Sequence, residues 1–194
     1  MFPASEAPDA VGHAGGMTQP KAAAASLPPP RDPGRPYRIC VVCLGNICRS
    51  PMGERVLAAE VTEAGLAGHV VVESAGTGDW HIGEAMDYRA RAELARRGHD
   101  GDGHEARQIQ PDWLDDYDLL LAMDRSNLAG LRAMASGRPE LAGRIALLRA
   151  FDPDAPHGAE VPDPYYGGPE DYAEVFDLVD AAAKGLVGQL ADLL

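Results

Sequence analysis

Short apolar runs alternate along the chain with segments whose apolar residues recur every three or four positions. Nearly continuous apolar runs of this length are typical of strands buried on both faces, as in a parallel sheet. Helical spacing that ends at a glycine predicts amphipathic helices. The pattern predicts strands at 38–42, 70–72, 118–123 and 144–148, and helices at 51–64, 86–97 and along the C-terminal run 172–190. This alternation indicates a single three-layer α/β domain.

The first 36 residues follow a different pattern. They hold eight of the sixteen prolines, with alanine and glycine between them and almost no large apolar side chain. Such a segment buries too little surface to offset its ordering entropy. We therefore predict a disordered tail over residues 1–36 and a folded domain over residues 37–194.

Composition narrows the partners and the compartment. The formal charge is −13, with 30 acidic and 17 basic residues, which argues against binding to nucleic acid or to anionic membrane surfaces. Three cysteines do not suggest a disulfide scaffold, and the start of the chain lacks the basic region and apolar core of a signal peptide. We expect a cytoplasmic monomer without nucleic-acid or membrane partners.

One polar loop, between the first predicted strand and the first predicted helix, carries residues of special chemistry. Cys43 and Arg49 are separated by five residues, so the loop between them can curl around one small anion. Inward backbone N–H groups, together with the free N–H groups of the next helix, form a cradle sized for phosphate. Arg49 offers a planar fork that binds two phosphate oxygens at once.

The residue types within the loop support this interpretation. Gly45 and Asn46 tolerate a positive φ, so the pair allows a tight reversal. Ser50 is predicted as the N-cap and Pro51 as the first helical residue, which places the positive end of the helix dipole under the loop. A thiol held in that field beside an arginine ionises easily, which makes Cys43 the candidate nucleophile.

Two alternatives remain open for the cysteines. Cys43 and Cys48 are also compatible with small buried hydrophobic residues beside an ordinary strand-to-helix turn. Cys40 and Cys43 form a C-x-x-C, a spacing found in redox and zinc sites. However, residues three apart on a strand point to opposite faces and no second pair of ligands follows, so we interpret Cys40 as a core residue.

The string Cys43-Leu44-Gly45-Asn46-Ile47-Cys48-Arg49-Ser50-Pro51 resembles the phosphate loop of the low-molecular-weight protein tyrosine phosphatases. The resemblance extends over roughly residues 37–194, with the motifs in the expected order. It implies a four-stranded parallel sheet with helices on both faces, and an enzyme that needs no metal or cofactor. It also implies that Cys43 and Arg49 are catalytic, that Ser50 has a supporting role, and that phosphate is bound by Leu44, Gly45, Asn46, Ile47, Cys48 and Arg49.

Two further segments are similar to parts of the same family. The glycine-rich loop 74–81 resembles its second active-site loop, which implies that Trp80 walls the pocket; the alternative is a ring folded onto the core edge. His81 is interpreted as a solvated loop residue. The segment 103–109 resembles one whose histidine braces the phosphate loop through its asparagine. This implies a supporting role for His104, against the alternative of a surface histidine.

The segment 161–168 resembles the acid loop of the family. The resemblance implies that Asp163 protonates the leaving oxygen and then activates water, and that Tyr165 and Tyr166 form the opposite wall of the pocket. Taken alone, Asp163 before a proline would be interpreted as a turn former. Asp124, at the end of the third predicted strand, is predicted to cap the next helix.

The resemblance implies hydrolysis of phosphotyrosine in proteins through a phosphocysteine on Cys43. Cys48 is a candidate redox partner that forms a reversible disulfide with Cys43. One alternative on the same fold is a phosphoarginine phosphatase, whose loop typically carries threonine where this chain has Ile47. Another is an arsenate reductase, which would need a further cysteine after Cys48 to relay oxidation. The chain has no cysteine after Cys48, which argues against this alternative. A non-catalytic phosphate-binding module is the third, although it would have no use for both Cys43 and Asp163.

Overall fold

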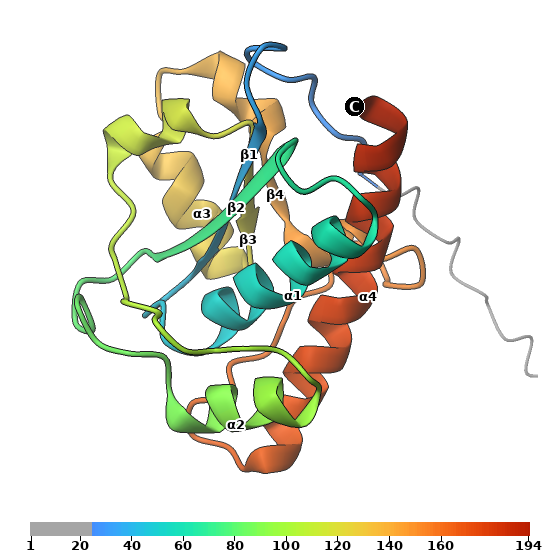
Figure 1. Ribbon diagram of the computed structural model, residues 1–194. Coiled ribbons are helices and arrows are strands. Elements are labelled where there is room, and N and C mark those ends of the chain that lie inside the picture. The colour runs from blue at the N-terminus through green and yellow to red at the C-terminus, as the bar shows by residue number, and fades with distance from the viewer. Residues whose placement is uncertain (1–24) are drawn as a thin grey trace, which may run out of the picture.

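The protein is seen in a computed structural model that describes residues 25–194. Four parallel strands form one sheet in the order β2-β1-β3-β4 (Figure 1). The strands are β1 (Tyr37–Cys43), β2 (Val70–Gly76), β3 (Leu119–Ala122) and β4 (Ile145–Leu147). Each of the four predicted strands is confirmed, because apolar runs buried on both faces have few alternatives in a domain of this size.

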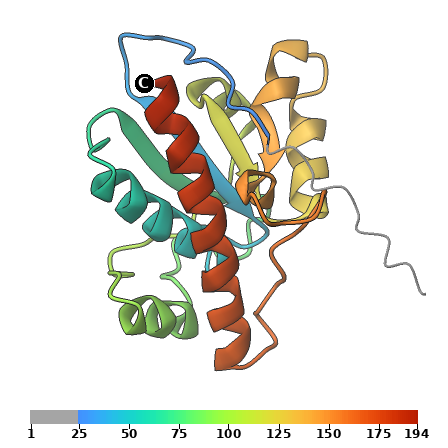
Figure 2. The same ribbon diagram turned by 90° about the vertical axis from the view of Figure 1, so that its right-hand side faces the viewer.

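Helices cover both faces of this sheet. One face carries α1 and α4, with α2 beside them, and the other face carries α3 (Figure 1 and Figure 2). The predicted α/β class with a four-stranded parallel sheet and helices on both faces is therefore confirmed. The helices are α1 (Arg49–Glu63), α2 (Tyr88–Arg96), α3 (Arg125–Met134) and α4 (Pro169–Leu193), with 3-10 turns η1 (Pro111–Asp116), η2 (Pro139–Arg144) and η3 (Leu148–Phe151).

The alternation of side chains along β1 divides the core in two. Ile39, Val41 and Cys43 face the cluster formed with α1 and α4, while Cys40 and Val42 face the cluster formed with α3. Cys40 and Cys43 thus lie on opposite faces of the sheet, as the spacing predicts. Burial raises the pKa of the Cys40 thiol to about 12, so this side chain is a neutral core residue at ordinary pH.

The first helix begins earlier than predicted. Helix α1 starts at Arg49, with Cys48 at the N-cap position and no side-chain capping bond. The prediction that Ser50 is the N-cap is therefore wrong. Ser50 lies inside the first turn, fully buried, and its hydroxyl group faces Cys43 instead. The Ser-Pro pair resembles a helix start, yet no side chain caps α1. The free N–H groups at the N-terminus of α1 therefore remain available to a ligand.

The N-terminal segment also requires a correction. Residues 25–36 are ordered against the domain, whereas the prediction made the whole of 1–36 a disordered tail. Main-chain and side-chain polar groups hold this stretch: Arg31 N donates to Asp118 Oδ1 (2.6 Å), and Tyr37 Oη donates to Pro28 O (3.0 Å). The prediction counted only apolar burial and missed these bonds. The part of the predicted tail that covers residues 1–24 lies outside the described residues.

The C-terminal helix α4 confirms the predicted packing helix. Pro169 occupies its first turn and Glu170 and Asp171 follow there, where carboxylates complement the helix dipole. One face of the helix is buried against α1 and the sheet. Among residues 25–194, no helix combines the length and the apolar character needed to cross a bilayer.

Candidate active site

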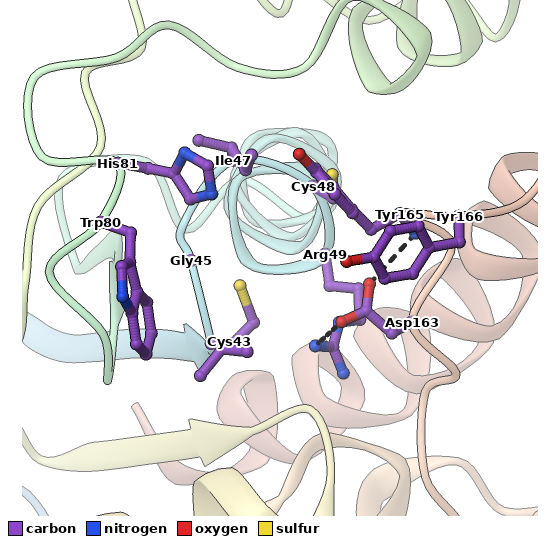
Figure 3. Close-up of a pocket in the computed structure, with 11 residues that line it drawn as sticks. Cys43, Gly45, Ile47, Cys48, Arg49, Trp80, His81, Asp163, Tyr165 and Tyr166 are labelled. Atoms are coloured by element: carbon purple, nitrogen blue, oxygen red, sulfur yellow. Dashed lines mark hydrogen bonds and ion pairs between the residues drawn. The ribbon is translucent and has the colours of Figure 1, made fainter.

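A cavity of about 270 Å³ opens at the carboxyl end of β1, where ligands bind in open parallel sheets. Figure 3 shows the Cys43 sulfur directed into this cavity, with Trp80 and His81 on one side and Asp163 and the two tyrosines on the other. The lining residues are Cys43, Leu44, Gly45, Ile47, Cys48, Arg49, Trp80, His81, Asp163, Tyr165 and Tyr166. The structure therefore brings together residues from three separate segments that the sequence had marked.

The Cys43 side chain is buried at the floor of the cavity and is surrounded by hydrogen-bond donors. Asn46 N donates to Sγ (3.3 Å), and Ser50 Oγ lies 3.0 Å from the same sulfur. The Ser50 hydroxyl accepts a bond from Asn46 Nδ2 (2.9 Å), and its single proton can point either at the sulfur or at Ala75 O, 3.2 Å away. A thiolate can only accept hydrogen bonds, so Asn46 N, and the Ser50 hydroxyl when its proton points at the sulfur, can donate to the attacking thiolate.

The backbone of residues 43–49, which we call the cysteine loop, is held by hydrogen bonds from outside. Four of its carbonyl groups accept such bonds, and in a trans peptide the next N–H points the opposite way. Four N–H groups therefore turn toward the cavity, and none of them donates to a protein acceptor within the described residues. The outside bonds run from Thr77 N to Cys43 O (2.9 Å), Gly78 N to Leu44 O (2.8 Å), His104 Nε2 to Asn46 O (2.7 Å) and Asp87 N to Ile47 O (2.8 Å). Such a ring of unpaired amides binds an anion.

Asn46 fixes the sharp turn of this loop from behind the cavity. It has a φ of 57°, and it is fully buried. Its Nδ2 donates to the hydroxyl groups of Ser50 and Ser74 (2.9 Å each), and its Oδ1 accepts from Arg107 N (2.9 Å). The Ser74 hydroxyl in turn donates to Glu54 Oε2 (2.6 Å). A left-handed backbone and a satisfied amide thus shape the loop together.

We expect Asn46→Ala to lower the free energy of unfolding by about 2–4 kcal/mol, because it adds left-handed strain and leaves buried polar partners unpaired. Asn46→Gly removes only the side-chain bonds, so its loss should be smaller by about 1 kcal/mol. Both variants should lose phosphate affinity. Urea denaturation and phosphate titration measure these effects, and an Asn46→Gly protein equal to wild type in both would contradict the bracing role.

His104 lies behind the same turn. Since a carbonyl accepts, the short contact with Asn46 O requires a proton on Nε2. Burial lowers the pKa of His104, so the ring is neutral at neutral pH. The alternative of a surface histidine is wrong, since the residue is 8% exposed.

Arg49 closes the cavity opposite the loop amides. Its side chain is 4% exposed and its guanidinium is divided between two carboxylates. One nitrogen donates to Asp124 Oδ2 and the other to Asp163 Oδ2, both at 2.6 Å. Asp124 also accepts from Asn127 N (2.7 Å) at the start of α3, which confirms its predicted capping role. The second contact of Asp124, with Arg49, was not predicted, although Asp124 follows β3 and Arg49 ends the loop that follows the neighbouring strand β1.

Residues 161–168, which we call the aspartate loop, form the other side of the cavity. The Asp163 side chain is 46% exposed and its Oδ1 accepts from Tyr165 N (3.2 Å). Tyr165 packs edge-on against Tyr166, with ring centroids 5.0 Å apart. The loop thus presents a carboxyl group and an aromatic wall to the same space.

The wall opposite the tyrosines is formed by the loop after β2. Trp80 is 70% exposed, so the alternative of a ring folded onto the core edge is wrong. The ring lies over Gly78, where a Cβ atom would collide with it. His81 was interpreted as a solvated loop residue rather than a catalyst, and its side chain is half-buried, at 27% exposed. Its ring lines the cavity against Gly45, and its Nδ1 lies 2.7 Å from Glu84 Oε2.

Cys48 shares the cavity but differs chemically from Cys43. The residue is 4% exposed, and its sulfur lies 3.5 Å from Tyr172 Oη. Burial raises the pKa of the Cys48 thiol to about 12, which keeps it neutral at ordinary pH.

A buried cysteine under a ring of unpaired amides, closed by an arginine, suits attack on a phosphate ester, because the donors surround three anionic oxygens while the sulfur faces phosphorus. Fold and site together define a cysteine-based phosphatase. Residues 38–193 match the family model described as low molecular weight phosphotyrosine protein phosphatase. The chain belongs to this family, as the loop around Cys43 predicted.

Individual relatives agree with this assignment. The chain is 46% identical over 157 residues to a low molecular weight protein-tyrosine-phosphatase of Streptomyces coelicolor. The aligned region covers 80% of this chain and 94% of the relative. It is 42% identical over 152 residues to low molecular weight protein-tyrosine phosphatase A of Mycobacterium tuberculosis, covering 78% and 90%. Among solved structures, YfkJ from Bacillus subtilis superposes with a TM-score of 0.75 at 35% identity, covering 83% of this chain and 98% of that one.

Proposed function

We propose that this protein hydrolyses phosphotyrosine in proteins in two steps, through a phosphocysteine on Cys43. In the first step the Cys43 thiolate attacks phosphorus, the ester P–O bond breaks, and the leaving phenoxide takes a proton from Asp163. In the second step the Asp163 carboxylate takes a proton from water, which attacks phosphorus and expels the thiolate with inorganic phosphate. The observation that carries this proposal is the position of Asp163 across the cavity from the buried sulfur.

The remaining roles follow from the geometry of the cysteine loop. The N–H groups of Leu44, Gly45, Ile47 and Cys48 and the guanidinium of Arg49 would bind the equatorial oxygens and stabilise the charge that develops on them, while the Asn46 N–H donates to the sulfur. Asn46, Ser50 and His104 would keep the loop in shape for this, as their hydrogen bonds suggest. Because these donors neutralise the phosphate, the scheme needs no metal or cofactor.

Phosphotyrosine is the substrate that the cavity walls favour. Trp80 on one side and Tyr165 and Tyr166 on the other offer aromatic faces to a flat ring. The names of the relatives, which are protein-tyrosine phosphatases, point to the same ester. Ile47 lines the cavity where phosphoarginine phosphatases typically carry threonine, which argues against phosphoarginine.

Two assays test this function. Hydrolysis of p-nitrophenyl phosphate in the presence of EDTA should proceed unchanged, and absence of turnover would instead favour a phosphate-binding module. Rates on matched phosphotyrosine and phosphoarginine peptides should differ strongly in favour of phosphotyrosine. Equal rates, or faster release of phosphate from arginine, would contradict the substrate assignment.

Cys48 is proposed as a redox partner of the nucleophile. Peroxide would oxidise the Cys43 thiolate to a sulfenic acid, and the Cys48 sulfur would displace water to form a disulfide. We expect mild peroxide to remove two hydrogen atoms from the wild-type mass, and dithiothreitol to restore both mass and activity. The Cys48→Ala variant should instead gain oxygen atoms irreversibly. If wild-type Cys43 passed directly to the sulfonic acid, as measured by mass spectrometry, the proposal would be wrong.

We also propose that the protein works as a monomer in the cytoplasm, where a reducing environment keeps the thiolate active. The formal charge of −13 argues against nucleic-acid partners. Sedimentation at working concentration and fractionation of cells would test both points.

A further inference from the structure

Arg89, in the first turn of α2, joins the two loops that enclose the cavity. Its guanidinium forms a two-pronged ion pair with Asp87, from Nε to Oδ1 (3.0 Å) and from one terminal nitrogen to Oδ2 (2.8 Å). Asp87 caps α2, and its own N–H donates to Ile47 O in the cysteine loop. Arg89 is therefore fixed in place relative to the cysteine loop.

The other terminal nitrogen of Arg89 reaches the aspartate loop. It donates to Gly167 O (3.3 Å), near the end of that loop. The guanidinium carbon also lies 5.7 Å from the centroid of the Tyr165 ring and 5.0 Å from that of Tyr172 on α4. These distances are typical of cation–π contact. One side chain thus contacts the backbone and an aromatic side chain of the aspartate loop.

Few side chains hold this loop. Among the described residues outside this loop and α4, two donate side-chain hydrogen bonds to the loop. Arg49 donates to Asp163 and to Val161 O, and Arg89 donates to Gly167 O. To act as the acid, Asp163 must carry a proton, and a neutral carboxyl group pairs weakly with Arg49. Bound phosphate would attract the Arg49 fork as well. In the reacting state, Arg89 then still holds the half of the loop after Asp163 by a hydrogen bond, whereas His81 contacts that half through its ring alone, with its centroid 6.3 Å from that of Tyr165.

We propose that Arg89 is a positioning residue, which acts through Asp163 by holding the aspartate loop against the cavity. The inference rests on the proposed acid role of Asp163. Loss of this hold leaves the nucleophile and the phosphate cradle intact but lets the acid move away from the leaving oxygen. The defect should therefore depend on how much the leaving group needs a proton.

The test compares phenyl phosphate, whose phenoxide needs protonation, with 2,4-dinitrophenyl phosphate, whose leaving group does not. The quantity measured is kcat/KM, which covers the steps up to leaving-group release. We expect Arg89→Met to lower it by about 10- to 100-fold for phenyl phosphate and by less than about threefold for the dinitrophenyl ester, as for a misplaced catalytic group. Arg91→Met is the matched control, since Arg91 pairs with Asp102 at the surface (2.8 Å), and it should behave as wild type on both esters.

Two further variants separate positioning from a general loss of structure. Arg89→Met leaves the nearly buried Asp87 carboxylate without its partner, so the double variant Asp87→Asn/Arg89→Met removes that charge and keeps a capping oxygen. It should show the same preference between esters. In an Asp163→Asn background, Arg89→Met should cause no further change in that preference.

The outcomes distinguish this inference from the function beneath it. If Asp163→Asn slows both esters equally, the acid assignment itself is wrong. If Asp163→Asn discriminates between the esters, but Arg89→Met and the double variant slow both equally or neither, then Arg89 has no positioning role.

Discussion

Replacing Cys43 with serine is expected to abolish turnover of every phosphate ester while leaving the fold intact. Loss of a covalent nucleophile of this kind costs on the order of 10⁶-fold in kcat. Serine is nearly isosteric, but its hydroxyl needs a base to attack phosphorus. Asn46 N and the Ser50 hydroxyl surround the position with donors, which stabilise a thiolate and take no proton from an alcohol. Hydrolysis of p-nitrophenyl phosphate measures the loss.

The Cys43→Ser protein should still bind inorganic phosphate, because the loop amides and Arg49 remain. Cys40→Ala is the matched control, since Cys40 lies in the core on the opposite face of β1. That variant should retain activity and lose only some stability. A Cys43→Ser protein with activity near that of wild type would show that another group attacks phosphorus, and the phosphocysteine scheme would then be wrong.

Most of the fold could be predicted from the sequence, because its strands are apolar on both faces. Runs such as 118–123 leave little choice but a buried strand, and a chain that alternates them with amphipathic helices has few ways to pack. The end of a helix is less certain. Ser50 and Pro51 looked like a cap, yet α1 begins at Arg49, and the Ser50 hydroxyl contacts the side chains of Cys43 and Asn46 instead of capping the helix.

The candidate site was predictable where one local string carries the chemistry. Cys43 and Arg49 are separated by only five residues of one loop, so the short connection itself keeps them close in space. Contacts that depend on tertiary packing were less visible. His81 lies in the wall because Gly45 leaves room for its ring, and nothing in the local sequence indicates that contact. Arg89 likewise resembles an ordinary helical arginine until its bond to Gly167 is seen.

The three cysteines show how position decides the chemistry of one side chain. Cys40 and Cys48 are surrounded so that burial keeps each thiol neutral, with a pKa of about 12 in both cases. Cys43 instead has Asn46 N and the Ser50 hydroxyl at its sulfur. A composition count treats the three alike, whereas the backbone N–H that donates to its sulfur and its place at the floor of the cavity distinguish Cys43 as the nucleophile.

Asp163→Asn should slow esters with poor leaving groups far more than esters with good ones. General acid catalysis contributes about 10²- to 10⁴-fold, so kcat/KM for phenyl phosphate should fall by an amount in this range. For 2,4-dinitrophenyl phosphate it should change little, because that phenolate leaves without a proton. Asparagine preserves the shape of the side chain and can still accept from Tyr165 N, so the loop keeps its structure.

The pH dependence gives an independent check of the same assignment. Asp163 must be protonated in the first step, so kcat/KM of the wild type for phenyl phosphate should fall as the pH rises and the carboxyl group ionises. The ionised form pairs with Arg49 (2.6 Å), which removes both a proton donor and a phosphate ligand at once. In Asp163→Asn this basic limb should be absent. If Asp163→Asn kept the fall of kcat/KM at high pH, or slowed both esters equally, the proton would come from another group. The acid assignment of Asp163 would then be wrong.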